Sequence, residues 1–148
     1  MAHRQTVGLQ RTGIVRRRII AAVYGLLCHG LFAAGVGMMI VQMYFGMSRC
    51  FGALEAPLSW LANAAFLLQF PLAHSFLLSA PGRRQLARLA PRAFSAELSA
   101  TTYVIIASAQ VFILFTFWTP SGVILWQARG ALFWILTSLY AASWLLLG

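Results

Sequence analysis

The sequence predicts an all-α integral membrane protein with four transmembrane helices and a short amphipathic cytoplasmic helix between the second and the third. Of its 148 residues, 61% are hydrophobic and only 9% are charged, whereas an ordinary soluble domain carries about 25% charged residues. The apolar residues are also grouped into four long uncharged segments, and most of the arginines lie between or before them. These three observations exclude a water-soluble fold.

Each of the four uncharged segments approaches or exceeds the length that a membrane helix needs. We expect spans at residues 19–45, 58–80, 101–118 and 131–147, which contain no Asp, Glu, Lys or Arg. A helix needs roughly 17 to 25 residues to cross the hydrocarbon core, so the last two segments lie near the lower limit. The first segment is too long and has the wrong flank for a cleavable signal peptide. Residues 1–18 are therefore expected to form a basic cytoplasmic arm, and residues 19–148 a four-helix transmembrane domain.

The positions of the arginines predict the orientation of the chain. All 11 basic residues are arginines; five precede the first span and four lie between the second and third, so nine fall on one side of a four-span protein. By the positive-inside rule, the N-terminus and the middle connection are expected to be cytoplasmic, in a bacterial inner membrane. Four aromatic residues lie near the predicted outer boundary, where amphipathic rings favour the headgroup region. They are Tyr44, Trp60, Trp118 and Trp126.

The net charge of +9 is better explained by lipid than by nucleic acid. Basic charge here flanks apolar spans, and no soluble domain exists to present it to a phosphate backbone. Attraction to anionic headgroups is worth on the order of 1 kcal/mol per basic residue near the surface. We expect lipid contacts from Arg16, Arg17, Arg18, Arg83, Arg84 and Arg88. The alternative for this basic segment is an anionic cofactor or substrate.

The connection between the second and third spans also has a helical pattern. Leu86, Leu89 and Ala90 recur at helical spacing with arginines between them, and Pro91 follows. This pattern predicts a short amphipathic helix that lies on the inner leaflet and stops before the proline.

A stripe of small residues on the first span predicts close packing against another helix. At 100° per residue, His29, Gly30, Ala33 and Gly37 fall on one face. Small residues let helix backbones approach closely in a membrane, where there is little hydrophobic drive for association. We expect His29 to be neutral and hydrogen-bonded to a neighbouring helix, with a ligand contact as the alternative. The packing partner is expected to be the second helix or a neighbouring subunit.

Polar residues of the second and third spans predict a cleft between them. Asn63 and His74 share one face of the second span, and Ser75 follows the histidine. On the third span, Tyr103 and Gln110 share a face. If these faces meet, a polar cleft opens to the cytoplasm, which is a common place for a ligand site in a helical bundle. Gln69 is expected to point away from this face.

These residues resemble a known family. Several segments look like the N-terminal half of membrane methyltransferases. They are the segment from Gln69 to Ser75, the basic stretch that follows, the start of the next span from Thr101 to Val104, and the segment from Phe117 to Gly122. The similar proteins are of the methanethiol S-methyltransferase and NnrU type, related to the isoprenylcysteine carboxyl methyltransferases. The resemblance extends over residues 61–148. It implies that His74, Ser75 and Tyr103 lie on the substrate side of a methyltransferase.

The chain departs from that family where the methyl donor would bind. Family members hold S-adenosylmethionine in a later segment with an Arg-x-Pro-x-Tyr motif, and no such motif occurs here. We therefore expect this segment to bind no cofactor, and S-adenosylmethionine only as part of a longer chain. We expect the chain to be either a piece of a longer enzyme or a relative of the family that lacks the catalytic half. The alternative function is a non-catalytic subunit of a larger membrane complex.

No other chemistry is indicated by the sequence. The two acidic residues, Glu55 and Glu97, are expected on opposite sides of the membrane, so they cannot act as a pair. The three histidines have no metal-ligand spacing, and no metal is expected. Cys28 and Cys50 would be about 33 Å apart along a continuous helix, too far for a disulfide.

Overall fold

The computed structural model describes residues 2–91, 98–124 and 126–147, with side chains from residue 13 onward. All the regular structure in these ranges is helical, and four of the helices are long and apolar enough to cross a membrane. The predicted all-α membrane fold is thereby confirmed. The helices are α1 (Ala2–Tyr44), α2 (Leu58–Leu78), α3 (Ala80–Leu89), α4 (Ser99–Phe117) and α5 (Gly130–Leu147).

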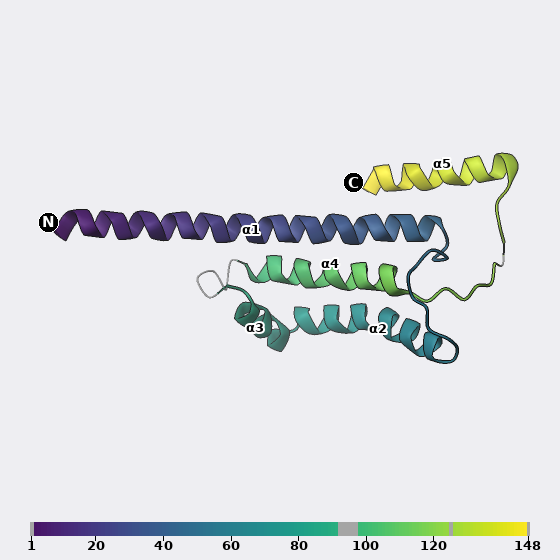
Figure 1. The fold of residues 1–148 in the computed structure, drawn as a ribbon, viewed down its shortest axis with the longest axis horizontal. Helices are drawn as coiled ribbons and strands as arrows, with labels where there is room; N and C mark the ends of the chain where they lie inside the picture. Colours follow the sequence, from purple (N-terminus) through teal and green to yellow (C-terminus); the bar gives the residue numbers. More distant parts are fainter. Residues whose placement is uncertain (1, 92–97, 125, 148) are drawn as a thin grey trace.

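The long helix α1 has no break between the expected basic arm and the expected span. It runs through 43 residues, which corresponds to about 64 Å at 1.5 Å per residue. The hydrocarbon core is only about 30 Å thick, so roughly half of α1 must lie beyond it. Figure 1 shows the N-terminal part of α1 projecting past the ends of the other helices. The basic residues of the arm therefore continue the helix of the span.

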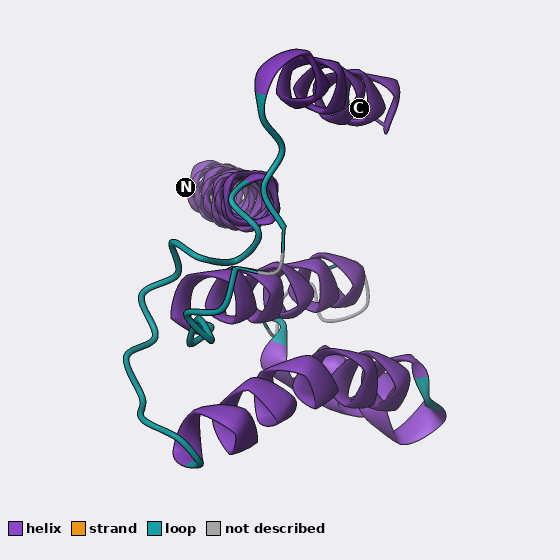
Figure 2. Cartoon of the chain, turned by 90° about the vertical axis from the view of Figure 1, so that its right-hand side faces the viewer, coloured by secondary structure: helices purple, strands orange, loops and turns teal. Residues whose placement is uncertain are grey.

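The helices are arranged with α4 in the middle. Figures 1 and 2 both show α1 on one side of α4 and α2 on the other, with α5 beyond α1. Among the described residues, α1 and α4 make the most extensive helix contact, whereas α5 contains no buried residue. For reference below, the "α3 end" of the bundle is the end at α3 and Ser99, and the "Arg49 end" is the opposite one.

The contact between α1 and α4 depends on a close backbone approach. A Cβ atom on Gly35 would lie 2.9 Å from the carbonyl oxygen of Ser108, a distance that real Cβ atoms do not adopt. On the same face of α1, the hydroxyl of Tyr24 is 3.0 Å from Oγ1 of Thr102, and Gln42 is 3% exposed. Tyr24, Gly35 and Gln42 are separated by 11 and seven positions in the sequence, and these spacings place them on one face of the helix.

The segment between α1 and α2 folds against the end of α4. The backbone N–H of Phe51 donates to the carbonyl of Thr116 at 2.7 Å, and that of Gly52 to Trp118 at 3.1 Å. A Cβ on Gly52 would lie 2.4 Å from the carbonyl oxygen of Phe117, so only glycine fits without a backbone shift. This segment closes the Arg49 end of the bundle and fixes where α2 begins.

The helix α3 forms a tight corner with α2. Ser79 has an extended backbone that ends α2, and its hydroxyl oxygen accepts a hydrogen bond from the N–H of Gly82 at 3.3 Å. Proline occupies an early position of α3, where its missing N–H costs no hydrogen bond. A Cβ on Gly82 would lie 2.0 Å from the carbonyl oxygen of Phe76. The corner therefore depends on the Ser79 cap and on this glycine.

The predicted amphipathic helix exists, but its apolar side is covered by protein. Leu86 and Ala90 are 4% and 3% exposed, and α3 contacts both α2 and α4. The helix ends at Leu89, before Pro91, as the sequence indicates. Leu89 is 64% exposed and is the one predicted apolar residue that is available to lipid.

Candidate functional site between α2 and α4

Three pairs of polar residues join α2 to α4, one near each end and one in the middle. At the Arg49 end, Nδ2 of Asn63 donates to the carbonyl of Thr119 at 2.8 Å, and its Oδ1 accepts from the N–H of Thr119 at 2.9 Å. The side-chain amide thus pairs with a peptide group in the segment after α4. Both hydrogen-bonding groups of Asn63 are satisfied, which suits a polar side chain within the membrane.

The middle pair consists of two glutamines. Nε2 of Gln69 donates to the carbonyl of Gln110 at 3.2 Å, and Nε2 of Gln110 donates to the carbonyl of Gln69 at 3.1 Å. The side chains also bond directly, from Nε2 of Gln110 to Oε1 of Gln69 at 2.5 Å. The prediction that Gln69 points away from α4 is wrong. Both the side chain and the backbone carbonyl of Gln69 bond to Gln110, and an amide left unpaired in hydrocarbon would cost several kcal/mol.

At the α3 end, His74 of α2 meets Tyr103 of α4. The Tyr103 hydroxyl lies 2.5 Å from Nδ1 and 3.1 Å from Nε2 of the imidazole, and the rings are 5.4 Å apart between centroids. The ring of Phe70 lies 5.5 Å from that of His74 on its own helix. Both members of the pair are partly buried. An imidazole hydrogen-bonded to a phenol can accept or donate a proton, so this pair is the chemically versatile group of the interface.

The predicted cleft residues do not all gather at one place. His74 and Tyr103 are in contact, but Asn63 precedes His74 by 11 residues, or about 16 Å along the helix. Ser75 is exposed and has no hydrogen-bond partner among the described residues. Among the described residues, the side chain of Gln110 bonds only to Gln69. The candidate site is therefore limited to the His74–Tyr103 pair at the α3 end, while the other two pairs join the helices.

Exposed arginines lie at the same end of the bundle as this pair. Arg83, Arg84 and Arg88 are exposed on α3, which follows His74 directly through the Ser79 corner. On α1, the exposed Arg16 and Arg18 lie six to eight residues before Tyr24, and Tyr24 contacts the residue next to Tyr103. Arg17 is also exposed and takes part in an interaction. The α3 end therefore carries a strong positive potential that favours anions.

The small-residue stripe of α1 does not form the close contact within this chain. Cβ atoms on Gly30 and Gly37 would meet nothing within 4 Å, and His29 and Ala33 are exposed. His29 bonds through Nδ1 to the carbonyl of Gly25 in its own helix at 2.8 Å, so its predicted bond to a neighbouring helix is not present in this chain. The second helix is not the packing partner; contact with a neighbouring subunit stays a prediction.

Sequence reasoning missed the face of α1 that packs on α4. A signal was available, because Tyr24, Cys28, Leu31, Gly35, Met38 and Gln42 follow a repeat of three and four residues. All six are partly or fully buried, whereas the predicted stripe is mostly exposed. The stripe of small residues indicated another face of the helix, which α4 does not contact. The face that packs on α4 is the one where Gly35 lies opposite the carbonyl of Ser108. Residue spacing alone does not show this contact.

The comparisons with known proteins leave the resemblance stated above untested. No protein-family model, no curated protein and no solved structure matches the chain. Within the described ranges, no three His, Cys, Asp or Glu side chains come together as a possible metal site. Cys28 and Cys50 are both free thiols.

Proposed function

We propose that this chain forms the substrate-side part of a membrane methyltransferase, with its basic α3 end in the cytoplasm. The observation that supports this proposal most directly is the hydrogen bond between His74 and Tyr103. These two residues belong to the two segments that carry the family resemblance, and they lie on different helices, 29 positions apart.

The described residues do not by themselves suit S-adenosylmethionine. The arginines at the α3 end can attract a carboxylate, but the described residues there include no acidic group for the ribose hydroxyls or the sulfonium. The donor would therefore be held mainly by another segment or chain. In this proposal, the role of the described residues is to bind and orient the substrate and to move its proton. The imidazole of His74 accepts a proton from a nucleophile, and Tyr103 orients the ring.

The test uses the complete reading frame with radiolabelled S-adenosylmethionine and a small thiol acceptor. His74→Ala is expected to lower kcat by about 100-fold, the lower range for loss of a general base. Tyr103→Phe is expected to lower kcat less, because the imidazole of His74 stays in place and loses only its hydrogen-bond partner. The yield of folded protein should change little for either variant.

Tyr24→Phe is the matched control for Tyr103→Phe. It also removes a phenol hydroxyl that bonds to α4, at the residue next to Tyr103, but on the face away from His74. Methylation by Tyr24→Phe should equal that of the unmodified protein. Equal losses in both tyrosine variants, or loss of folded protein with His74→Ala, would assign the pair to structure. Absence of methylation in the unmodified protein would remove the enzymatic proposal altogether.

A second candidate function is a non-catalytic subunit of a membrane complex. It is favoured by the two uncovered surfaces, namely α5, which has no buried residue, and the stripe of Gly30 and Gly37. Under this proposal, Gly30→Leu or Gly37→Leu releases the chain from its complex on a native gel, while insertion in the membrane is unchanged. Unaltered complex size in both variants would contradict it.

A further inference from the structure

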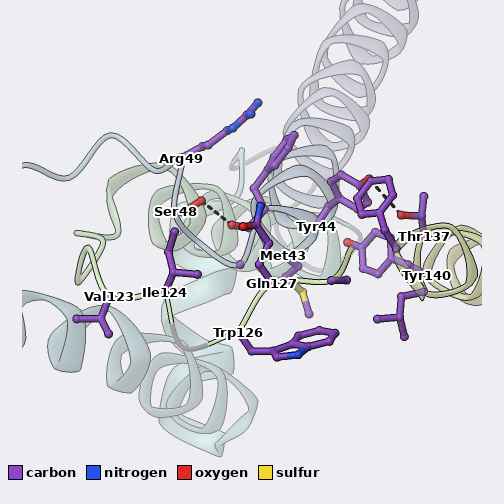
Figure 3. A pocket seen from close by; sticks show the side chains of 15 residues that line it. Met43, Tyr44, Ser48, Arg49, Val123, Ile124, Trp126, Gln127, Thr137 and Tyr140 are labelled. Atoms are coloured by element: carbon purple, nitrogen blue, oxygen red, sulfur yellow. Dashed lines mark hydrogen bonds between the residues drawn. The ribbon is translucent and has the colours of Figure 1, made fainter. Parts of the chain in front are cut away.

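A continuous groove separates α5 from the last turns of α1 at the Arg49 end. Two cavities of about 860 and 290 Å³ adjoin there. Both are lined by Tyr44, Phe45, Thr137 and Tyr140, so they form one groove that runs along the facing sides of the two helices. Figure 3 shows these tyrosines and Thr137 at one side of the larger cavity and Arg49 at another.

Side-chain contacts join the two walls of the groove. The Tyr140 hydroxyl donates to the carbonyl of Ile40 at 2.6 Å, and the hydroxyls of Tyr44 and Thr137 are 3.3 Å apart. The rings of Tyr44 and Tyr140 also lie 5.7 Å apart between centroids. These contacts join α5 to α1 without closing the space beside them, because they are made by long side chains and not by close backbone approach.

The polarity of the groove changes along its length. The smaller cavity adds only apolar or aromatic residues, Ile40, Val41, Ala141 and Trp144, to the shared set. The larger cavity opens toward Ser48, Arg49 and Gln127. Arg49 is the only charged residue among the 15 that line it. Its guanidinium carbon lies 3.6 Å from the centroid of the Phe45 ring, which holds the cation beside the groove.

The position of this gradient matches the boundary of a membrane. Tyr44 is the last residue of α1 and Trp126 lies shortly before α5, so the polar part falls at the headgroup level and the apolar part in the hydrocarbon. An amphiphile has the same gradient. An apolar space within the hydrocarbon region is filled by an acyl chain at no desolvation cost, and an exposed cation at the headgroup level favours an anionic headgroup.

We propose that this groove is a binding site for an anionic phospholipid. One acyl chain lies between α1 and α5 against Ala141 and Trp144, and the phosphate lies against Arg49. The proposal concerns the end of the bundle opposite His74 and does not depend on the methyltransferase. A lipid in the groove would also cover part of α5, which has no buried residue in the described part of the chain.

The experiment uses the full chain in phosphatidylcholine nanodiscs that contain a minor fraction of phosphatidylglycerol with a photoactivatable acyl chain. Labelled positions are read by mass spectrometry. Labels are expected on the facing sides of α1 and α5, at the residues that line the groove. Ala141→Trp fills the apolar part and should lower labelling several-fold. Ala142→Trp is the matched control, because Ala142 is exposed and does not line the groove.

The headgroup is tested separately. Arg49→Gln should reduce labelling by phosphatidylglycerol about fivefold, as expected for one lost headgroup contact, with little change for the same probe on phosphatidylcholine. Arg129→Gln, on an exposed arginine that does not line the groove, should have no effect. Equal labelling in all variants, or no headgroup preference in the unmodified protein, overturns the proposal. So does photo-crosslinking of the groove residues to another polypeptide in native membranes.

Discussion

The two faces of α4 are joined to their neighbours in different ways. Toward α1, backbone meets backbone where Gly35 lies against the carbonyl of Ser108, and the helix contact is extensive. Toward α2, two pairs of polar side chains connect the helices, and the Asn63 amide bonds to the backbone just after α4, across a less extensive contact. Close approach gains dispersion energy from many atoms, whereas a polar pair mainly avoids the cost of unpaired groups in hydrocarbon. The first kind of contact is therefore sensitive to added volume, and the second to lost partners.

The largest effect is expected from added volume on the α1 face. Gly35→Leu places side-chain atoms where the Ser108 carbonyl lies, so the helices must separate. Overpacking of this kind typically costs about 1–3 kcal/mol, and more where backbone atoms are the obstacle. The free energy of unfolding in mixed micelles, followed by circular dichroism, measures it. Gly30→Leu is the control, since nothing lies within 4 Å of a Cβ there; equal losses for both would remove the distinction between the two faces.

A smaller effect is expected from lost partners on the α2 face. Gln69→Leu and Gln110→Leu each leave the other amide without its side-chain partner, at a cost of about 0.6–1.7 kcal/mol for a hydrogen bond within a membrane. The double variant should lose less stability than the sum of the two single losses, because no unpaired amide is then left by the change. A double-mutant cycle on the same unfolding measurement gives the coupling energy. Additive losses would mean that the two side chains stabilise the bundle independently.

The packing of the segment between α1 and α2 against α4 can be tested by the reactivity of a thiol. Cys50 lies between α1 and α2, and burial raises the pKa of its thiol above the usual value. Less thiolate is then present near neutral pH, so modification by an impermeant maleimide should be slow there and should rise steeply with pH. Ser48→Cys in a Cys50→Ser background is exposed and should react faster at neutral pH. Equal rates would show that the segment does not pack against α4 in the membrane.

The same reagent tests the proposed orientation in intact cells. Cys50 should be modified from outside, whereas Arg88→Cys in a Cys50→Ser background should react only after the membrane is permeabilised. Modification of Arg88→Cys in intact cells would reverse the orientation.

The sequence predicted correctly which sides of α2 and α4 face one another, because helix periodicity decides that. His74 and Tyr103 each face the neighbouring helix as their spacing implies, and Gln110 lies on the same face as Tyr103. The prediction for Gln69 was wrong because the side chain and the backbone carbonyl of this residue both bond to Gln110, and the direction of a Cβ atom shows neither contact. The prediction for Asn63 was correct about its face, but it did not foresee that the amide would pair with a backbone group beyond the end of α4.

By itself, the sequence determined that this protein is a set of membrane-spanning helices and where those helices lie. Long uncharged segments have no stable alternative in a bilayer, since every backbone polar group must be satisfied within the segment. Only the tertiary structure decided which face of α1 meets α4. Several faces of α1 are equally apolar, so hydrophobicity does not choose among them. The choice falls to specific fits, such as Gly35 opposite Ser108 and Tyr24 opposite Thr102, which depend on residues 73 and 78 positions apart in the chain.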